Sequence, residues 1–348
     1  MRNYKEHLIH QDQTVKEALS QLDLLASDAI LFVVDDDNRL IGSLTDGDVR
    51  RGLMSDKSTS QPVTDFIQPN PRFVEKGKYD MKQIIDYREA HFKIIPVVDR
   101  NGAVVNIINF KHQKSYLPVD ALVMAGGRGS RLRPKTDTVP KPLLKVGDKT
   151  IIDHNIDRLI KFGVDDFWLS VRYLGEQLER HFGDGTDRYV KIGYVWEDEP
   201  LGTLGAASKI TDFHHDYVLV TNSDILTTLN YEDFFLDFIE KDADMSVVTI
   251  PYNVDVPYAV METSNNHVIS FREKPTYTYY SNGGIYLIKK EILENIPQNT
   301  FYNTTDLMQE LVDSGKKLVS YPIRQYWLDI GKPEDFEKAQ EDIKHLEL

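Results

Sequence analysis

The sequence contains no cysteine, which excludes thiol nucleophiles, disulfide bonds and thiolate metal sites. No apolar run approaches the roughly 20 residues of a transmembrane helix, and the first residues lack the apolar core of a signal peptide, so we expect no membrane association and a cytoplasmic location. Basic residues are also scarce, with 41 Lys and Arg against 55 Asp and Glu and a formal net charge of −14. Because polyanion binding needs a basic face, we do not expect a nucleic-acid partner.

The first third of the chain contains an internal repeat. The 348 residues exceed one ordinary domain of roughly 100–150 residues, so two or three domains are expected. The segment 30–35 (ILFVVD) recurs as 94–99 (IIPVVD), and the alignment continues without a gap through the following residues. Each copy predicts a helix followed by two strands joined by a turn, and the second turn contains an Asn-Gly hairpin signal.

These two copies resemble a pair of CBS motifs, with repeats at residues 1–58 and 59–116. The resemblance implies a tandem α/β module that binds an adenine nucleotide or forms dimers. It places ribose-binding side chains at Thr45 and Asp48, whereas the second copy has Asn109 and His112 there. The alternative is that Asp48 only caps the helix that begins near Val49, in a structural or oligomerisation module. Both interpretations stay open.

A glycine-rich turn follows the apolar strand expected at residues 119–124. Its sequence, AGGRGSRL, begins at Ala125, and its glycines allow backbone N–H groups to approach phosphate oxygens closely. A Walker A loop requires GxxxxGK[ST], which is absent. A dinucleotide fingerprint requires a third glycine where this chain has Leu132. The turn alone therefore predicts only a phosphate-handling loop.

The residues that follow extend this turn into a longer motif. Residues 126–144 (GGRGSRLRPKTDTVPKPLL) match the signature GGxGxRLxPxTxxxPKPLL over nineteen positions. The chain thus resembles sugar-1-phosphate nucleotidyltransferases, which join a nucleoside triphosphate to a sugar 1-phosphate and release pyrophosphate. Segments 197–206, 220–224, 271–275, 281–286 and 327–331 follow in that family's order. We therefore expect residues 119–348 to form the catalytic domain.

The resemblance assigns roles to individual residues. It implies that Arg131 and Lys141 are catalytic, Arg131 along the triphosphate and Lys141 on the sugar phosphate and α-phosphate. It implies that Asp224 and Asp329 bind Mg²⁺, a cation that prefers oxygen ligands. The implied nucleotide-binding residues are Ala125, Gly126, Gly127, Gly129, Glu197, Gly202 and Thr203. The implied sugar-binding residues are Gly202, Glu273, Lys274, Asn282 and Gly283.

Strand and helix patterns alternate through the second part of the chain, which predicts an α/β fold with a Rossmann-like, doubly wound mixed sheet of the GT-A-like nucleotidyltransferase type. Asp224 follows an apolar strand, and α/β sheets bind ligands at the carboxyl ends of strands. The pair His214-His215 lacks metal-ligand spacing and is expected at the surface. The expected strands are 167–171, 190–196, 217–221, 245–250, 258–261, 268–271 and 285–288. The expected helices are 151–162, 175–182, 231–241, 305–314 and 333–346.

The loop at residues 197–206 bears on the choice of base. It resembles the loop of mannose-1-phosphate guanylyltransferases, and a carboxylate such as Glu197 can accept hydrogen bonds from guanine N1 and N2. GTP is favoured, with CTP, UTP and dTTP open. Relatives that carry CBS motifs serve surface-polysaccharide or nonulosonic acid synthesis, so glucosamine, mannose and heptose 1-phosphates are candidate substrates of an expected homo-oligomer.

The residues disfavour two other classes of function. One is a nucleotide-sensing regulatory protein whose transferase-like domain is catalytically silent, which intact Arg131, Lys141, Asp224 and Asp329 disfavour. The other is an NAD-dependent oxidoreductase, which the missing GxGxxG disfavours.

Overall fold

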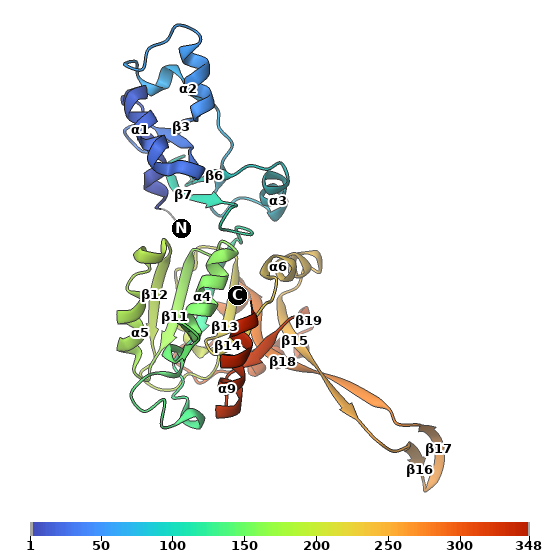
Figure 1. Cartoon of the computed structure of the whole chain (residues 1–348). Coiled ribbons are helices and arrows are strands. Elements are labelled where there is room, and N and C mark those ends of the chain that lie inside the picture. The colour runs from blue at the N-terminus through green and yellow to red at the C-terminus, as the bar shows by residue number, and fades with distance from the viewer. Residues whose placement is uncertain (1–2, 347–348) are drawn as a thin grey trace. The chain divides into compact units, whose positions relative to one another are not determined.

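The computed structural model describes residues 3–346, which form two compact units (Figure 1). The first unit comprises the residues up to Val119 together with Leu159–Asp166 and Gly183–Ile192. The second comprises Asp120–Arg158, Phe167–Phe182 and the residues from Gly193 onward.

The two halves of the first unit share the order strand, helix, strand, strand, and the first half continues with a further helix and a short strand. In each half a short parallel strand lies beside an antiparallel hairpin. Each hairpin contains a β-bulge at the equivalent position, between Val33 and Val34 in one half and between Val97 and Val98 in the other. The matching bulges agree with the repeat read from the sequence. The elements are β1 (Leu8–His10), α1 (Val15–Leu25), β2 (Leu31–Val34), β3 (Leu40–Leu44), α2 (Asp46–Leu53) and β4 (Gln68–Pro69), then β5 (Val74–Glu75), α3 (Met81–Glu89), β6 (Ile94–Val98) and β7 (Val104–Asn109).

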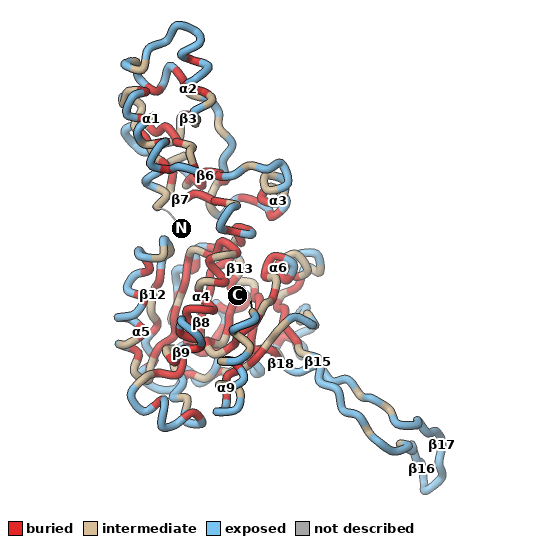
Figure 2. Tube along the Cα trace, in the orientation of Figure 1, coloured by how far each residue is buried: buried red, intermediate tan, exposed pale blue. Residues whose placement is uncertain are grey.

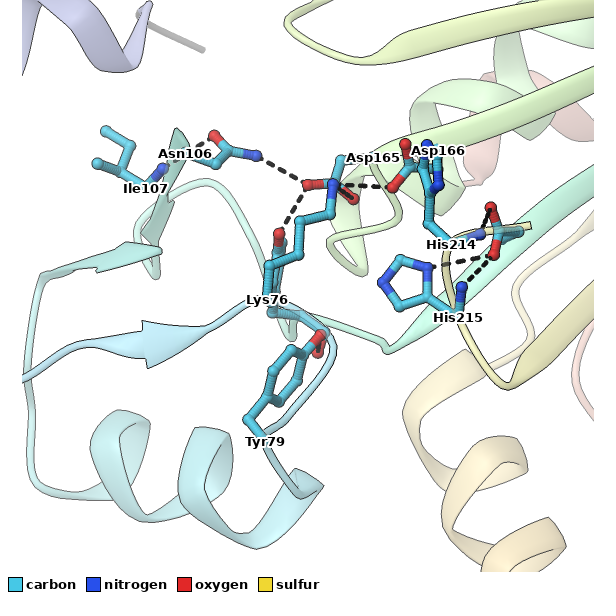
Figure 3. A network of polar contacts seen from close by, with 10 residues as sticks. Lys76, Tyr79, Asn106, Ile107, Asp165, Asp166, His214 and His215 are labelled. Carbon is cyan, nitrogen blue, oxygen red and sulfur yellow. Dashed lines mark hydrogen bonds and ion pairs between the residues drawn. The ribbon is translucent and has the colours of Figure 1, made fainter. Parts of the chain in front are cut away.

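A charged network holds Leu159–Asp166 within the first unit (Figure 3). Lys76 Nζ lies 3.4 Å from Asp165 Oδ1 and 2.8 Å from Asp166 Oδ2. Asn106 Nδ2 and the Tyr116 hydroxyl donate to Asp165 Oδ2 at 3.0 and 2.6 Å. Burial lowers the pKa of Lys76, but the two carboxylates outweigh it and raise that pKa above its usual value. Because every bond ends on an ionised carboxylate, each is stronger than one between neutral groups.

The second unit is built on a seven-stranded sheet in the order β12-β11-β8-β13-β18-β15-β19. β18 runs antiparallel to β13 and β15, and β19 runs parallel to β15. The predicted α/β fold with a mixed sheet is therefore confirmed. The sheet strands are β8 (Val119–Met124), β11 (Asp166–Val171), β12 (Lys191–Trp196), β13 (Tyr217–Asn222), β15 (Met245–Asp255), β18 (Thr276–Lys289) and β19 (Leu318–Pro322); the helices are α4 (Ile151–Lys161), α5 (Gly175–Phe182), α6 (Tyr231–Glu240), α7 (Lys290–Leu293), α8 (Thr304–Asp313) and α9 (Pro333–Asp342).

Two of the sheet strands continue beyond the core as a long ribbon, which we call the arm (residues 251–282). It consists of the outer parts of β15 and β18 and, at its end, a hairpin of β16 (Val260–Ser264) and β17 (His267–Arg272). Figure 1 shows the arm projecting from the sheet, and in Figure 2 it is coloured as exposed along most of its length. Of the two long strands the sequence predicted only 245–250 and 285–288, whereas the predicted strands 258–261 and 268–271 overlap β16 and β17 at the end of the arm.

One expectation about surface residues was wrong. His215 is buried, with 4% of its surface exposed. Its backbone N–H donates to Asp120 Oδ2 at 2.8 Å, and its ring Nδ1 lies 3.3 Å from the same oxygen (Figure 3).

None of the helices within residues 3–346 combines the length and apolarity needed to cross a bilayer. The cytoplasmic location stays a prediction.

Candidate active site

The glycine-rich loop leaves the end of β8 and passes close to two other segments. Gly129 has φ +59°, and a Cβ there would lie 2.8 Å from the Cβ of Lys141. A Cβ on Gly126 would lie 3.0 Å from Glu197 Oε1. The loop is closed by Thr136, whose hydroxyl donates to the Gly129 carbonyl at 2.9 Å. Glycine is therefore required at position 129 for both conformation and space.

Lys141 is buried with its ammonium group inside the site. It lies in the short 3₁₀ turn Lys141–Leu143, and only 8% of its surface is exposed. Its Nζ donates to Asp224 Oδ2 in an ion pair. Arg131 approaches the same region, because a Cβ on Gly331 would lie 3.3 Å from the Arg131 guanidinium. Both predicted catalytic cations thus face the predicted metal ligands.

The two predicted metal-binding carboxylates lie on neighbouring strands. Asp224 follows β13 and precedes β14 (Ile225–Thr227), and Asp329 ends β20 (Trp327–Asp329). β14 and β20 are antiparallel, with Ile225 opposite Asp329, and the Ile330 N–H donates to the Asp224 carbonyl at 3.0 Å. This pairing brings both side chains to one end of the short sheet.

The side chains of Asp224 and Asp329 carry unsatisfied acceptors. Among the described residues, the buried Oδ1 atom of each has no hydrogen-bond partner. Burial and then the negative charge of Asp224 raise the pKa of Asp329, although Lys141 and Arg131 act in the opposite direction. Two buried carboxylate oxygens without partners fit a divalent cation that prefers oxygen ligands.

Glu197 follows β12 and is buried, with 7% of its surface exposed. The Ser170 hydroxyl donates to its Oε1 atom, and the Leu201 N–H donates to Oε2 at 3.0 Å. A carboxylate oxygen can accept more than one hydrogen bond, so both Glu197 oxygens can still accept a bond from a ligand.

The loop after Glu197 is tied to the start of α8. Gly202 has φ +78°, and a Cβ there would lie 2.6 Å from the Tyr302 carbonyl oxygen. The Thr203 N–H donates to Asn303 Oδ1 at 3.3 Å, and the Thr203 and Thr304 hydroxyls lie 3.2 Å apart. This contact could not be predicted from the sequence, because residues 301–304 match no motif segment.

A cavity of about 390 Å³ gathers most of these residues. Of the predicted set, Ala125 lies behind the loop, with its N–H donating to the Ser170 carbonyl at 2.9 Å. The predicted residues that line the cavity are Gly126, Gly127, Gly129, Arg131, Lys141, Glu197, Gly202, Thr203 and Asp224. The lining residues without a predicted role include Arg172, Pro200, Asn222, Ser223 and Phe301. Arg172 directly follows β11, so its position at a strand's carboxyl end was the one available indication.

The predicted sugar-binding residues are divided between two places. Asn282 and Gly283 lie where the arm joins the sheet, and the Gly283 carbonyl accepts a hydrogen bond from Trp327 Nε1 at 2.8 Å. Glu273 and Lys274 lie between β17 and β18 and are exposed. None of these four residues lines the cavity. The structure therefore does not bring this predicted set together within one chain.

In the first unit, Thr45 and Asp48 form a capping box at the start of α2. Asp48 Oδ2 accepts from the Thr45 N–H at 2.8 Å and from its hydroxyl at 2.6 Å. Asp48 Oδ1 accepts from Arg51 Nη2 at 2.5 Å and from Gln68 Nε2 at 2.9 Å. Burial alone would raise the pKa of Asp48, but these hydrogen bonds hold it below its usual value. The geometry is that of the helix cap, and the ribose role stays a prediction.

An α/β sheet with a phosphate loop, two cations and the Asp224 carboxylate around one cavity, and Asp329 on the adjoining strand pair, defines a nucleotide-handling domain. A model of the nucleotidyl transferase family matches residues 120–345, and a CBS domain model matches residues 5–55. The chain belongs to the nucleotidyl transferase family and carries a CBS domain before the transferase region. The second CBS repeat and the domain boundaries stay predictions.

Individual relatives resemble the transferase region. A D-glycero-alpha-D-manno-heptose 1-phosphate guanylyltransferase from Aneurinibacillus thermoaerophilus is 31% identical, over 65% of this chain and 99% of its own. The mannose-1-phosphate guanylyltransferase of Mycobacterium tuberculosis is 30% identical over 65% and 64%, and the UTP–glucose-1-phosphate uridylyltransferase of Synechocystis is 30% identical over 66% and 64%. The match thus spans about two thirds of the length of the latter two relatives.

Solved structures resemble the same part of the chain. HddC from Yersinia pseudotuberculosis, complexed with GMP-PN, is 26% identical with a TM-score of 0.50, over 65% of this chain and 99% of its own. A putative glucose-1-phosphate thymidylyltransferase from Bacillus anthracis is 22% identical with a TM-score of 0.53, over 66% of this chain and 97% of its own, which shows the shared fold.

Proposed function

We propose that this protein transfers a nucleoside monophosphate from a nucleoside triphosphate to a sugar 1-phosphate, forming a nucleotide sugar and pyrophosphate. One observation carries the proposal. The glycine-rich loop, the Lys141 ammonium and the Asp224 carboxylate line one cavity of about 390 Å³, and Asp329 lies across the adjoining strand pair. Cations and backbone N–H groups suit phosphates, and the two carboxylates suit the metal that accompanies a triphosphate.

In this reaction a phosphate oxygen of the sugar 1-phosphate attacks the α-phosphorus of the nucleotide. The nucleophile is ionised at neutral pH and needs no general base, so the main obstacle is the approach of two anions. Catalysis therefore rests on positioning and charge neutralisation. Lys141 holds the sugar phosphate against the α-phosphate, and Arg131 stabilises the charge that moves onto pyrophosphate. Asp224 and Asp329 hold Mg²⁺, which supplies further neutralisation of the triphosphate.

The proposed base is guanine. Glu197 lines the cavity as a buried carboxylate with its two oxygens held by Ser170 and Leu201. A carboxylate only accepts hydrogen bonds, and the guanine N1 and N2 groups only donate them. Guanylyltransferases for heptose and mannose 1-phosphates are among the relatives, alongside a uridylyltransferase. We therefore propose heptose, mannose and glucosamine 1-phosphates as acceptors, in surface-polysaccharide or nonulosonic acid synthesis.

A substrate panel tests this proposal. Pyrophosphate release is measured for GTP, CTP, UTP and dTTP, each with the three sugar 1-phosphates and Mg²⁺, and with EDTA as the control. We expect release to be fastest with GTP and one of these sugars. If no pair releases pyrophosphate, the transferase proposal fails, and a nucleotide-sensing protein with a silent transferase domain becomes the better explanation.

The same assay tests regulation through the CBS domain, which is part of the proposal. AMP and ATP are added to the working substrate pair. A rate that changes at saturating adenine nucleotide, and stops changing in an Asp48→Ala variant, supports a ligand at the first unit. An unchanged rate leaves Asp48 with its capping role alone.

We expect a Glu197→Gln variant to lose preference for GTP. The amide presents a donor on one side, so one hydrogen bond to guanine is lost and kcat/KM for GTP falls by about 10- to 100-fold, as for a hydrogen bond to a charged group. The rate with UTP should change much less. Glu176→Gln, an exposed carboxylate on α5, is the matched control and should leave both rates unchanged. Equal losses with GTP and UTP would show that Glu197 does not select the base.

A further inference from the structure

The arm has one apolar face that none of the residues 3–346 covers. In the part nearest the sheet, Tyr252 lies opposite Tyr279 and Val254 lies opposite Tyr277. Residues two apart on a strand share a face, so these four side chains lie together. Tyr252 and Tyr279 are 62% and 60% exposed. An apolar face of this kind is normally packed against a core.

The opposite face of the same ribbon carries two polar pairs, with the exposed Tyr280 beside them towards the sheet. The Thr278 hydroxyl donates to Asn253 Oδ1 at 2.9 Å, and the Thr276 hydroxyl donates to Asp255 Oδ1 at 2.6 Å. Each of these bonds joins directly opposed residues of β15 and β18. A polar, internally bonded face beside an apolar one is the pattern of a sheet with one side solvated and the other covered.

The end of the arm repeats this division. Met261 lies opposite Phe271, and the two are 60% and 68% exposed. On the alternate face Glu262 lies opposite Ser270, whose hydroxyl donates to it at 2.5 Å. The hairpin of β16 and β17 forms its own two-stranded sheet. An isolated two-stranded ribbon is at best marginally stable in water, so a partner surface is needed along the whole arm.

The uncovered area is large enough for a specific interface. Half of the large hydrophobic side chains that are exposed among residues 3–346 belong to the arm. Tyr252, Tyr258, Phe271 and Tyr279 are each between 60% and 76% exposed. With roughly 200 Å² for a whole aromatic side chain, these four alone leave about 530 Å² in water. A standard interface takes about 800 Å² from each partner, and aromatic residues are enriched in such interfaces.

The arm's charges favour a second copy of this chain as the partner. The whole chain carries a formal net charge of −14. The arm contains three acidic residues, Asp255, Glu262 and Glu273, against Arg272 and Lys274, so it is close to neutral. An almost uncharged aromatic ribbon approaches an acidic copy without repulsion. It lacks the basic cluster that would attract nucleic acid or an anionic membrane.

The positions of the predicted sugar-binding residues indicate where the arm would dock. Lys274 lies eight residues before Asn282 along the strand direction. At about 3.4 Å for each residue, the two positions are separated by roughly 27 Å. A single sugar ring cannot span that distance. Within one chain, Asn282 and Gly283 lie near β20, the strand that ends at the proposed metal ligand Asp329. Glu273 and Lys274 lie far from that strand.

We propose that two copies of the chain exchange their arms, and that Glu273 and Lys274 of each copy complete the sugar end of the other copy's cavity. A two-fold axis makes the exchange reciprocal, since the apolar face that one copy presents is the same face that it receives. This inference rests on the proposed transferase function for the sugar contacts. The docking of the apolar face stands independently of it.

A pair of neighbouring substitutions tests the docking. Tyr279→Glu places a charge on the apolar face, and Thr278→Glu places the same charge on the polar face of the same strand. Molar mass in solution is measured by light scattering for both variants and the unmodified chain. We expect the unmodified chain and Thr278→Glu to be dimers and Tyr279→Glu to be a monomer. A monomeric unmodified chain, or equal dimerisation of the two variants, overturns the proposal.

A mixed dimer tests the completion of the site. One copy carries Lys141→Ala and the other carries Glu273→Ala with Lys274→Ala, and the two are co-expressed with different affinity tags and purified together. If arms are exchanged, one of the two sites combines an intact cavity with an intact arm. We then expect about half of the unmodified activity, although each variant dimer alone is inactive. An inactive mixed dimer, or full activity of the arm variant alone, overturns the exchange.

The two tests separate the arm from the reaction. If the unmodified chain turns over no substrate pair, the proposed function fails, and the molar masses of Tyr279→Glu and Thr278→Glu still decide whether the arm docks on a second copy. If the chain is active and the mixed dimer is not, the reaction stands and the exchange fails.

Discussion

A Lys141→Ala variant is expected to lose about three orders of magnitude in kcat with the preferred substrate pair, the size of effect seen when a group that stabilises transition-state charge is removed. Lys141 is the buried cation whose Nζ reaches Asp224 in the cavity. No other described lysine lines that cavity. Without the Lys141 ammonium, the sugar phosphate and the α-phosphate approach each other with less neutralisation of their negative charges. Single-turnover measurement of pyrophosphate release separates this effect from weaker binding.

Lys145→Ala is the matched control, because Lys145 lies four residues further along and is exposed. We expect it to retain full turnover and the melting temperature of the unmodified chain. Lys141→Arg keeps the charge but changes its shape, so partial recovery is expected. Full turnover by Lys141→Ala would overturn the assignment of this residue.

An Asp329→Asn variant is expected to lose at least 100-fold in activity while becoming more stable without metal. Burial and the charge of Asp224 raise the pKa of Asp329. A carboxyl whose pKa is raised by folding binds more protons in the folded state, so its contribution to stability falls as pH rises from the unfolded pKa through the folded one. An amide removes that unfavourable charge at neutral pH. We expect the melting temperature of this variant in EDTA at neutral pH to lie above that of the unmodified chain.

The metal gives this prediction its second readout. Adding Mg²⁺ should raise the melting temperature of the unmodified chain, because a ligand that binds the folded state stabilises it, and should have no effect on Asp329→Asn. Glu334→Gln, an exposed carboxylate in the first turn of α9, should respond to Mg²⁺ like the unmodified chain. A lower melting temperature for Asp329→Asn in EDTA, or an undiminished response to Mg²⁺, would contradict the proposed metal site.

The fold and the phosphate end of the site could be predicted because their determinants are local. Gly129 and Lys141 are twelve residues apart in one motif, and the glycine is needed where the lysine passes. The helix Gly175–Phe182 was predicted with its observed bounds, since its apolar spacing is regular.

The arm and the far wall of the cavity could not be predicted in the same way. Thr276–Tyr279 alternates Thr and Tyr, but alternation identifies a strand's faces only when a core decides which face is buried, and this ribbon has no such core among the described residues. Phe301 and Tyr302 reach the site only because α8 begins beside Gly202. Such long-range contacts leave no mark at either position in the sequence. For Asp48, residue type alone could not distinguish a cap from a ribose ligand.

Trp327 connects parts of the molecule that the motifs treat as separate. Its indole N–H bonds the Gly283 carbonyl at the base of the arm, and it begins the three-residue strand that ends at Asp329. A pull on the arm therefore passes through one hydrogen bond and two residues to a carboxylate of the proposed metal site. A movement of the base of the arm would therefore displace Asp329, one of the two proposed metal ligands. Docking of the arm and the affinity of the proposed site for metal would then be coupled through Trp327. Because the indole lies between the two, a change in its fluorescence would report the movement.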